Sequence, residues 1–131
     1  KSVEEARARG KNVILDVDTI GAMKIRALCP DATLIYILPP SWDELKSRLS
    51  STGIYTEEEV NALMEIAEEE ISCANSYDYI LVNDTISNTL SRFAQIIHSN
   101  RYSRNCMKEF LDSYIDGEVK PHVQSYKEAL L

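Results

Sequence analysis

Short, solid apolar runs alternate along this chain with longer stretches in which apolar residues recur at helical spacing. Continuous apolar runs that end in turn residues are typical of buried parallel strands. We therefore predict strands over residues 13–17, 33–38 and 79–82. The last two runs end at Pro39-Pro40 and at Asn83-Asp84, and a proline pair cannot continue a sheet ladder.

Apolar residues three and four positions apart predict amphipathic helices between and after these strands. Ser41 with Glu44, and Thr56 with Glu59, have the spacing of capping boxes, which mark helix starts. The predicted helices cover residues 2–9, 20–28, 41–49, 56–72, the stripe from 86 to 97, 103–115 and 121–131. Strands that alternate with helices in this way predict an α/β fold with a mainly parallel sheet flanked by helices.

Composition and charge narrow the range of functions. The 131 residues suffice for one domain, and a net charge of −7 disfavours binding to nucleic acid or to anionic membranes. No apolar run approaches the roughly 18 residues of a membrane span, and no secretory leader is recognisable. The three cysteines and two histidines lack metal-site spacing, so a reducing, cytoplasmic location is expected.

Polar residues follow the predicted strands where an open α/β sheet holds its ligands. Asp16 and Asp18 close the first strand, and Asn83 and Asp84 close the last. A carboxylate at this place can serve a magnesium ion, because hard cations prefer carboxylate oxygens. For Asp18 a second role stays open, since aspartate also caps helices. The acidic face of the helix over 56–72 is interpreted as solvated rather than metal-binding.

Three stretches together resemble the guanylate kinase family. They are GKNVILDVDTIGAMKIR (10–26), PDATLIYILPPSWDELKSRL (30–49) and the stretch from TEEEV to YDYILVND (56–84), in the family's order and at its spacings. The resemblance covers the C-terminal two-thirds of such a protein. It implies a P-loop nucleoside monophosphate kinase-like fold that lacks its central first strand. The chain is then one partial domain over 1–131, with a core over 1–100 and a C-terminal helical extension over 101–131.

The resemblance also implies an activity and the residues that serve it. The family transfers a phosphoryl group from ATP to GMP, giving ADP and GDP, with Mg²⁺ accompanying ATP. Asp16 matches the aspartate of the magnesium-phosphate region and Asp18 a residue that helps to recognise the guanine of GMP. Arg48 matches a catalytic lid arginine that contacts the ATP phosphates, and Asn83 the asparagine beside the adenine. Whether the protein forms a homo-oligomer stays open.

The chain also departs from the family. It contains no GxxxxGK[ST] phosphate-binding loop, and most of the GMP-binding segment is absent. Thr52 and Leu63 stand where the family has lid arginines, and Ile20 where it has glutamine. The chain alone is therefore expected to be inactive and to be a portion of a longer polypeptide, a reading favoured over direct pairing of its first two strands or completion by another chain. A catalytically lapsed scaffold that binds a protein partner is the alternative function.

Overall fold

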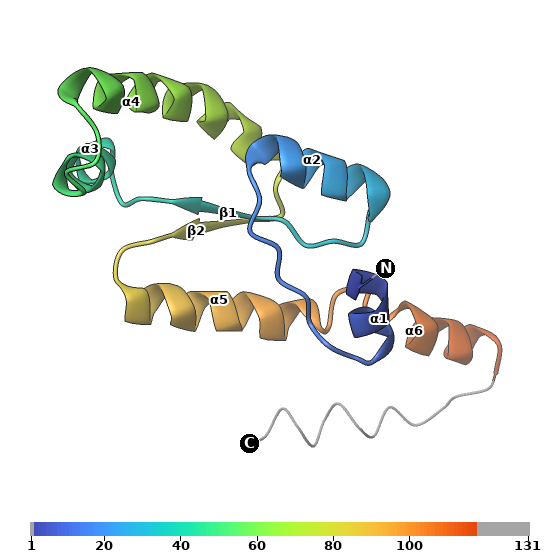
Figure 1. Cartoon of the computed structure of the whole chain (residues 1–131). Helices are drawn as coiled ribbons and strands as arrows, with labels where there is room; N and C mark the ends of the chain where they lie inside the picture. The colour runs from blue at the N-terminus through green and yellow to red at the C-terminus, as the bar shows by residue number, and fades with distance from the viewer. Residues whose placement is uncertain (1, 118–131) are drawn as a thin grey trace. The chain divides into compact units, whose positions relative to one another are not determined.

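The computed structural model describes residues 2–117 and divides the chain into two compact units, residues 1–34 and 35–131. Figure 1 shows the elements in chain order. The first unit contains helices α1 (Ser2–Ala8) and α2 (Thr19–Leu28). The elements of the second unit are β1 (Ile35–Leu38), α3 (Trp42–Ser51), α4 (Glu57–Ile71), the short 3-10 helix η1 (Ser72–Ser76), β2 (Tyr79–Val82), α5 (Ile86–Asn100) and α6 (Lys108–Ile115).

The strand predicted over residues 13–17 is wrong. Residues 11–18 carry no regular secondary structure, and the apolar side chains of this run are exposed, among them Ile14 at 68% and Leu15 at 46%. A strand exists only where a neighbouring backbone satisfies its N–H and C=O groups. The described residues form one sheet, made of β1 and β2, and residues 13–17 are not part of it. The first two predicted strands therefore do not pair directly.

Helix α2 ends where the sequence predicts. The helix stops at Leu28, two residues before Pro30, because the residue before a proline is disfavoured in the helical conformation. Arg26, in the last turn, then donates from Nη1 to the carbonyl oxygen of Ala32 at 3.0 Å. This bond ties the loop back to the helix, and Ala22 and Leu34 are the buried apolar residues of this unit.

The sheet of the second unit confirms the other two predicted strands. β1 and β2 are parallel and in register from Ile35 opposite Tyr79 to Leu38 opposite Val82. The backbone N–H of Asn83 adds a bond of 2.7 Å to the carbonyl oxygen of Leu38, so the pairing extends to the end of both strands. A parallel pair requires a crossover connection, and α3, α4 and η1 provide it. The α/β class is thus correct.

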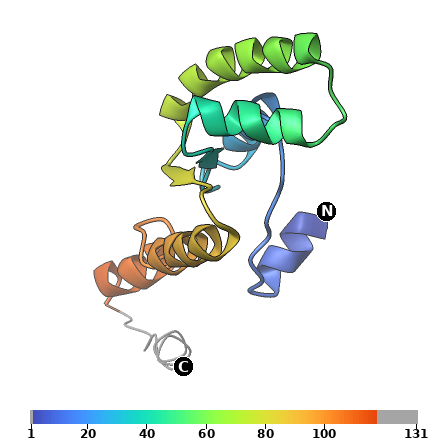
Figure 2. The ribbon, with the colours of Figure 1, turned by 90° about the vertical axis from the view of Figure 1, so that its left-hand side faces the viewer.

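The helices of this unit start where side chains cap them. The Ser41 hydroxyl accepts a hydrogen bond from the backbone N–H of Glu44 at the start of α3, and α4 begins with a complete capping box between Thr56 and Glu59. Gly53 allows the turn between them, since its φ of 65° is unfavourable for residues with a Cβ. In both views α5 lies on one side of the strand pair and α3 and α4 lie on the other (Figures 1 and 2).

The C-terminal part differs from the prediction in one boundary. The helix predicted over 103–115 begins later, as α6 over Lys108–Ile115, and residues 101–107 form turns. The helix predicted over 121–131 lies outside the described residues. Among the described helices, none is both long and apolar enough to cross a membrane.

Candidate functional site

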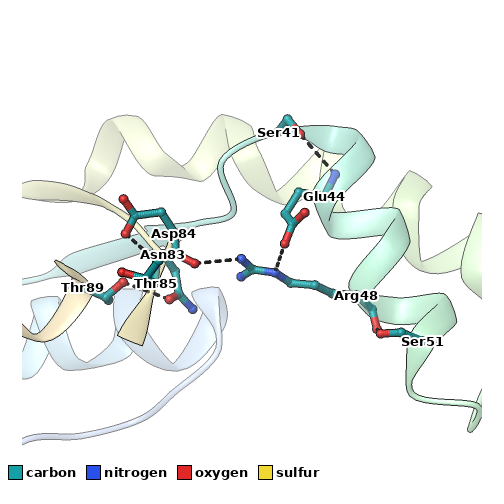
Figure 3. A network of polar contacts seen from close by, with 8 residues as sticks. All are labelled: Ser41, Glu44, Arg48, Ser51, Asn83, Asp84, Thr85 and Thr89. Carbon is teal, nitrogen blue, oxygen red and sulfur yellow. Dashed lines mark hydrogen bonds and ion pairs between the residues drawn. The ribbon is translucent and has the colours of Figure 1, made fainter. Parts of the chain in front are cut away.

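A network of polar contacts lies at the carboxyl ends of β1 and β2, where an α/β sheet offers its ligand site. It joins side chains of α3 to the segment that leads from β2 into α5, as Figure 3 shows. Two of the residues predicted from the sequence, Arg48 and Asn83, belong to this network. The structure therefore brings together two positions that lie on separate elements of the chain.

Arg48 projects from α3 toward the end of β2. Its Nε donates to Glu44 Oε1 at 2.8 Å, and its Nη2 donates to the backbone carbonyl oxygen of Asp84 at 3.3 Å. The Arg48 side chain is 38% exposed. Its third nitrogen, Nη1, has no partner among residues 2–117. The guanidinium is thus oriented by two contacts and keeps one nitrogen for an anion, a group that arginine binds well.

Asn83 is held by its backbone and by its side chain. The backbone N–H pairs with Leu38, as described above. The side-chain oxygen Oδ1 accepts a hydrogen bond of 3.0 Å from the hydroxyl of Thr89, on the first turns of α5. Asn83 and Thr89 are both half-buried. With Oδ1 engaged by Thr89, the amide nitrogen Nδ2 is the donor that Asn83 can offer to a ligand.

Asp84 fixes the turn from β2 into α5. Its carboxylate accepts hydrogen bonds from the backbone N–H of Thr85 at 2.6 Å and from Asn88 Nδ2 at 3.3 Å. It also forms an ion pair of 3.1 Å with Arg92, whose Nη1 donates to the carbonyl oxygen of Val82 as well. The Thr85 N–H bond, followed by the Asn88 and Arg92 contacts, lowers the pKa of Asp84 below its ordinary 3.8. Asp84 therefore carries its charge at neutral pH.

An open groove of about 710 Å³ runs beside this network, between β2 and α5. Its lining is mostly apolar, with Tyr79, Leu81 and Ile96 among its residues, and Pro40, Asp84 and Arg92 also belong to it. A concave, largely apolar surface with a few polar groups is the usual form of a small-molecule site.

Asp16 and Asp18, the other two predicted site residues, belong to the first unit. Asp18 is the N-cap of α2, and its Oδ1 accepts a hydrogen bond of 2.6 Å from the backbone N–H of Gly21. A Cβ on residue 21 would lie 2.9 Å from that oxygen, so the glycine makes room for the cap. The capping role left open above is thus confirmed, while a role in GMP binding stays a prediction. Asp16 is exposed.

The carboxylates do not form a preassembled metal site. No group of three or more His, Cys, Asp or Glu residues that could hold a metal occurs within residues 2–117. The acidic side chains predicted to face solvent on α4 are exposed, at positions 57, 58, 65, 68 and 69. A Mg²⁺ ion commonly needs only one or two carboxylates, because substrate phosphates and waters complete its shell. The exposed carboxylate of Asp16 could serve as one such ligand.

Thr52 and Leu63, the positions at which the resemblance implies missing lid arginines, have local structural roles. The hydroxyl of Thr52 donates to the carbonyl oxygen of Leu49 at 2.8 Å and accepts from the backbone N–H of Ile54 at 3.2 Å. Thr52 therefore shapes the turn at the end of α3. Leu63 is half-buried on α4, in the apolar stripe predicted for that helix. Neither side chain can bind a phosphate as an arginine does.

Sequence reasoning missed Thr89 and Arg92. Thr89 stands among the polar positions of an amphipathic helix, where a threonine attracts no attention. Only the folded turn brings its hydroxyl within 3.0 Å of Asn83. Arg92 gave no signal either, since it lies eight positions after Asp84, beyond the spacing of three or four residues that is typical of ion pairs on a helix.

Comparison with known proteins gives a consistent result. The family model described as "Guanylate kinase" matches residues 1–100. The guanylate kinase of Clostridium acetobutylicum is 37% identical over 127 residues, which cover 96% of this chain and 59% of that protein. That of Francisella tularensis is 46% identical over 94 residues (71% and 50%), and that of Thermus thermophilus 37% identical over 110 residues (84% and 50%). The chain thus spans between 50% and 59% of the length of these relatives.

Proposed function

This chain belongs to the guanylate kinase family, and we propose that the complete protein transfers a phosphoryl group from ATP to GMP, giving ADP and GDP. The sequence identity to guanylate kinases supports this activity. We also propose the P-loop nucleoside monophosphate kinase fold, in which a strand carrying the phosphate-binding loop lies between residues 13–17 and β1. That strand would supply the backbone partner that residues 13–17 lack among the described residues.

One observation carries the proposal. The contact between Arg48 Nη2 and the Asp84 carbonyl oxygen holds the Arg48 guanidinium 3.3 Å from the backbone of the residue next to Asn83. In the proposed role, Asn83 lies beside the adenine of ATP and Arg48 contacts its phosphates. Phosphoryl transfer depends on positioning and on positive charge around the transferring group, with little covalent participation by the protein. The open Nη1 of Arg48 is suited to that task.

In the proposed function, residues of the first unit would contact GMP and the Mg²⁺ ion. Asp18 would accept hydrogen bonds from the guanine of GMP through the oxygen that is not used in capping α2. Asp16 would act on the Mg²⁺ that accompanies ATP, directly or through water. Bound to the phosphates, this ion neutralises part of their charge during transfer.

A second function is favoured by Thr52 and Leu63. Replacing two lid arginines with a turn-forming threonine and a half-buried leucine removes positive charge that stabilises the transition state. The protein would then be a scaffold that has kept the nucleotide residues but lost the reaction, and would bind a protein partner. Under either function, the present chain alone is expected to be inactive, because it contains no phosphate-binding loop.

The test is a coupled assay of ADP formation from ATP with GMP as acceptor, using the product of the intact gene. Turnover that depends on GMP and on Mg²⁺ supports the kinase. Calorimetry that detects GMP binding without turnover supports the scaffold. Absence of binding of both nucleotides by the complete protein would overturn both proposals.

A further inference from the structure

We propose that Thr89 is a positioning residue for the ATP site: its hydroxyl fixes the Asn83 amide so that Nδ2 is presented to the adenine base. The inference rests on the function proposed above and adds a residue to it. It follows from the hydrogen bond of 3.0 Å between Thr89 Oγ1 and Asn83 Oδ1, which Figure 3 shows at the start of α5.

An asparagine amide has two faces of opposite character. Its oxygen accepts hydrogen bonds and its nitrogen donates them, so rotation by half a turn changes what the side chain recognises. In this structure Oδ1 is engaged by Thr89, and Nδ2 has no partner among residues 2–117. With this bond formed, Asn83 is oriented to act as a donor toward a ligand.

Hydrogen bonds at the start of α5 hold the backbone of Thr89 in place. Its backbone N–H donates to the carbonyl oxygen of Thr85, which places it in the regular first turns of α5. Thr85 caps that helix, since its hydroxyl accepts from the N–H of Asn88 at 3.3 Å. Asn83 in turn is tied to Leu38 through its backbone. Both partners of the hydrogen bond therefore have backbones that are held by hydrogen bonds of their own.

The ligand chemistry follows from a donor at this position. Adenine offers ring nitrogens as acceptors and its exocyclic amino group as a donor. The Nδ2 group can donate a hydrogen bond to a ring nitrogen of adenine, whereas it faces the amino group donor to donor. If the Thr89 hydroxyl is removed, the amide can turn, and part of the population then offers its oxygen to the base. ATP affinity falls as a result, while GMP affinity does not change.

The experiment compares the complete wild-type protein with Thr89→Val, Thr89→Ser and Ser91→Ala, measuring the dissociation constant for ATP by calorimetry and both KM values. Valine keeps the shape of threonine without its hydroxyl, and serine restores the hydroxyl. Ser91 is an exposed residue of α5, so Ser91→Ala is the matched control. We expect Thr89→Val to weaken ATP binding about five-fold, the effect of one lost hydrogen bond, and Thr89→Ser and the control to bind as wild type does.

A double-mutant cycle separates positioning from mere stability. In an Asn83→Ala background, Thr89→Val should have no further effect on ATP binding, because there is no amide left to orient. Equal weakening in both backgrounds, or equal loss of ATP and GMP affinity, overturns the inference, as does a complete protein that binds no ATP. A complete protein that binds ATP but has no turnover contradicts the kinase alone, because the ATP dissociation constants still test Thr89.

Discussion

Arg48 of α3 donates a hydrogen bond from Nη2 to the backbone carbonyl oxygen of Asp84, a residue 36 positions further along the chain. The bond connects the helix that follows β1 to the turn that follows β2. Arg48 also donates from Nε to Glu44, which lies one turn earlier on the same helix. An arginine held in this way needs little reorganisation when it meets a phosphate, because part of the ordering entropy is already lost.

Removing this guanidinium should reduce the reaction more than nucleotide binding. We expect Arg48→Ala in the complete protein to lower kcat with ATP about 100-fold, the scale for loss of one transition-state donor. Lys46→Ala removes an exposed cation from the same helix and is the charge-matched control. Steady-state kinetics with ATP and GMP varied in turn decide the matter. If both variants lose the same activity, general charge rather than Arg48 is responsible.

Asp18 can be tested for two roles with two substitutions. Asp18→Ala removes both the cap and the carboxylate, so we expect about 1 kcal/mol less stability and weaker GMP binding. Asp18→Asn keeps an oxygen that caps α2 nearly as well but has no charge. It should unfold like wild type in urea and still bind GMP weakly, with ATP binding unchanged. Should Asp18→Asn bind GMP normally, the aspartate acts only as a cap. The exposed Asp31, changed to Asn, is the control.

From the capping box of α4 we predict an effect on stability and none on catalysis. Thr56 Oγ1 accepts from the N–H of Glu59 at 3.3 Å, and Glu59 Oε2 accepts from the N–H of Thr56 at 2.8 Å. Thr56→Ala removes the acceptor of the Glu59 N–H and keeps the bond from the residue 56 N–H to Glu59 Oε2, so it should lower the free energy of unfolding by about 1 kcal/mol. Thr56→Ser should restore most of it, and Glu58→Ala, one exposed position away, should change it little. Urea denaturation measures all four proteins.

The depressed pKa of Asp84 predicts how stability depends on pH. The Thr85 N–H bond, with the Asn88 and Arg92 contacts, favours the charged carboxylate in the folded state. The stabilisation is therefore complete above the ordinary pKa of 3.8 and is lost as the pH falls through the lower folded value. Asp84→Asn has no such titration. The difference in unfolding free energy between wild type and this variant should be constant above about pH 5 and shrink below about pH 4.

Two measurements check this directly. Urea unfolding at stepwise lower pH gives the difference for the two proteins, and NMR titration of the Asp84 carboxyl carbon gives its pKa. An ordinary pKa for Asp84, or a difference that stays constant through acid pH, would contradict the contacts described for this carboxylate.

Local signals in the sequence were sufficient where an element depends on its own residues. The Thr56 and Glu59 spacing predicted the start of α4, and the structure contains both hydrogen bonds. Ser41 also caps α3 as predicted, but the Glu44 carboxylate binds Arg48 instead of closing a capping box. Arg48, one turn further along the helix, competes for the Glu44 carboxylate, and the spacing of Ser41 and Glu44 alone could not reveal this.

Local signals failed where an element depends on a distant partner. The run over 13–17 has the apolar character of a buried strand, yet its backbone has no sheet neighbour in the described part of the chain. The Thr89 contact is another example, because it arises only when the turn after β2 is folded. The roles of Arg48 and Asn83 came from resemblance to a family, and the structure adds that Arg48 contacts the residue next to Asn83.

The backbone bond from Asn83 to Leu38 has a mechanical consequence. Leu38 is followed by Pro39, Pro40 and the cap residue Ser41, so only a three-residue, stiff connector separates the sheet from the helix that carries Arg48. A shift of Asn83 would therefore be transmitted through this connector to the start of α3, and a shift of α3 would act on the end of β1. Reporters at Asn83 and at the start of α3 should therefore respond together.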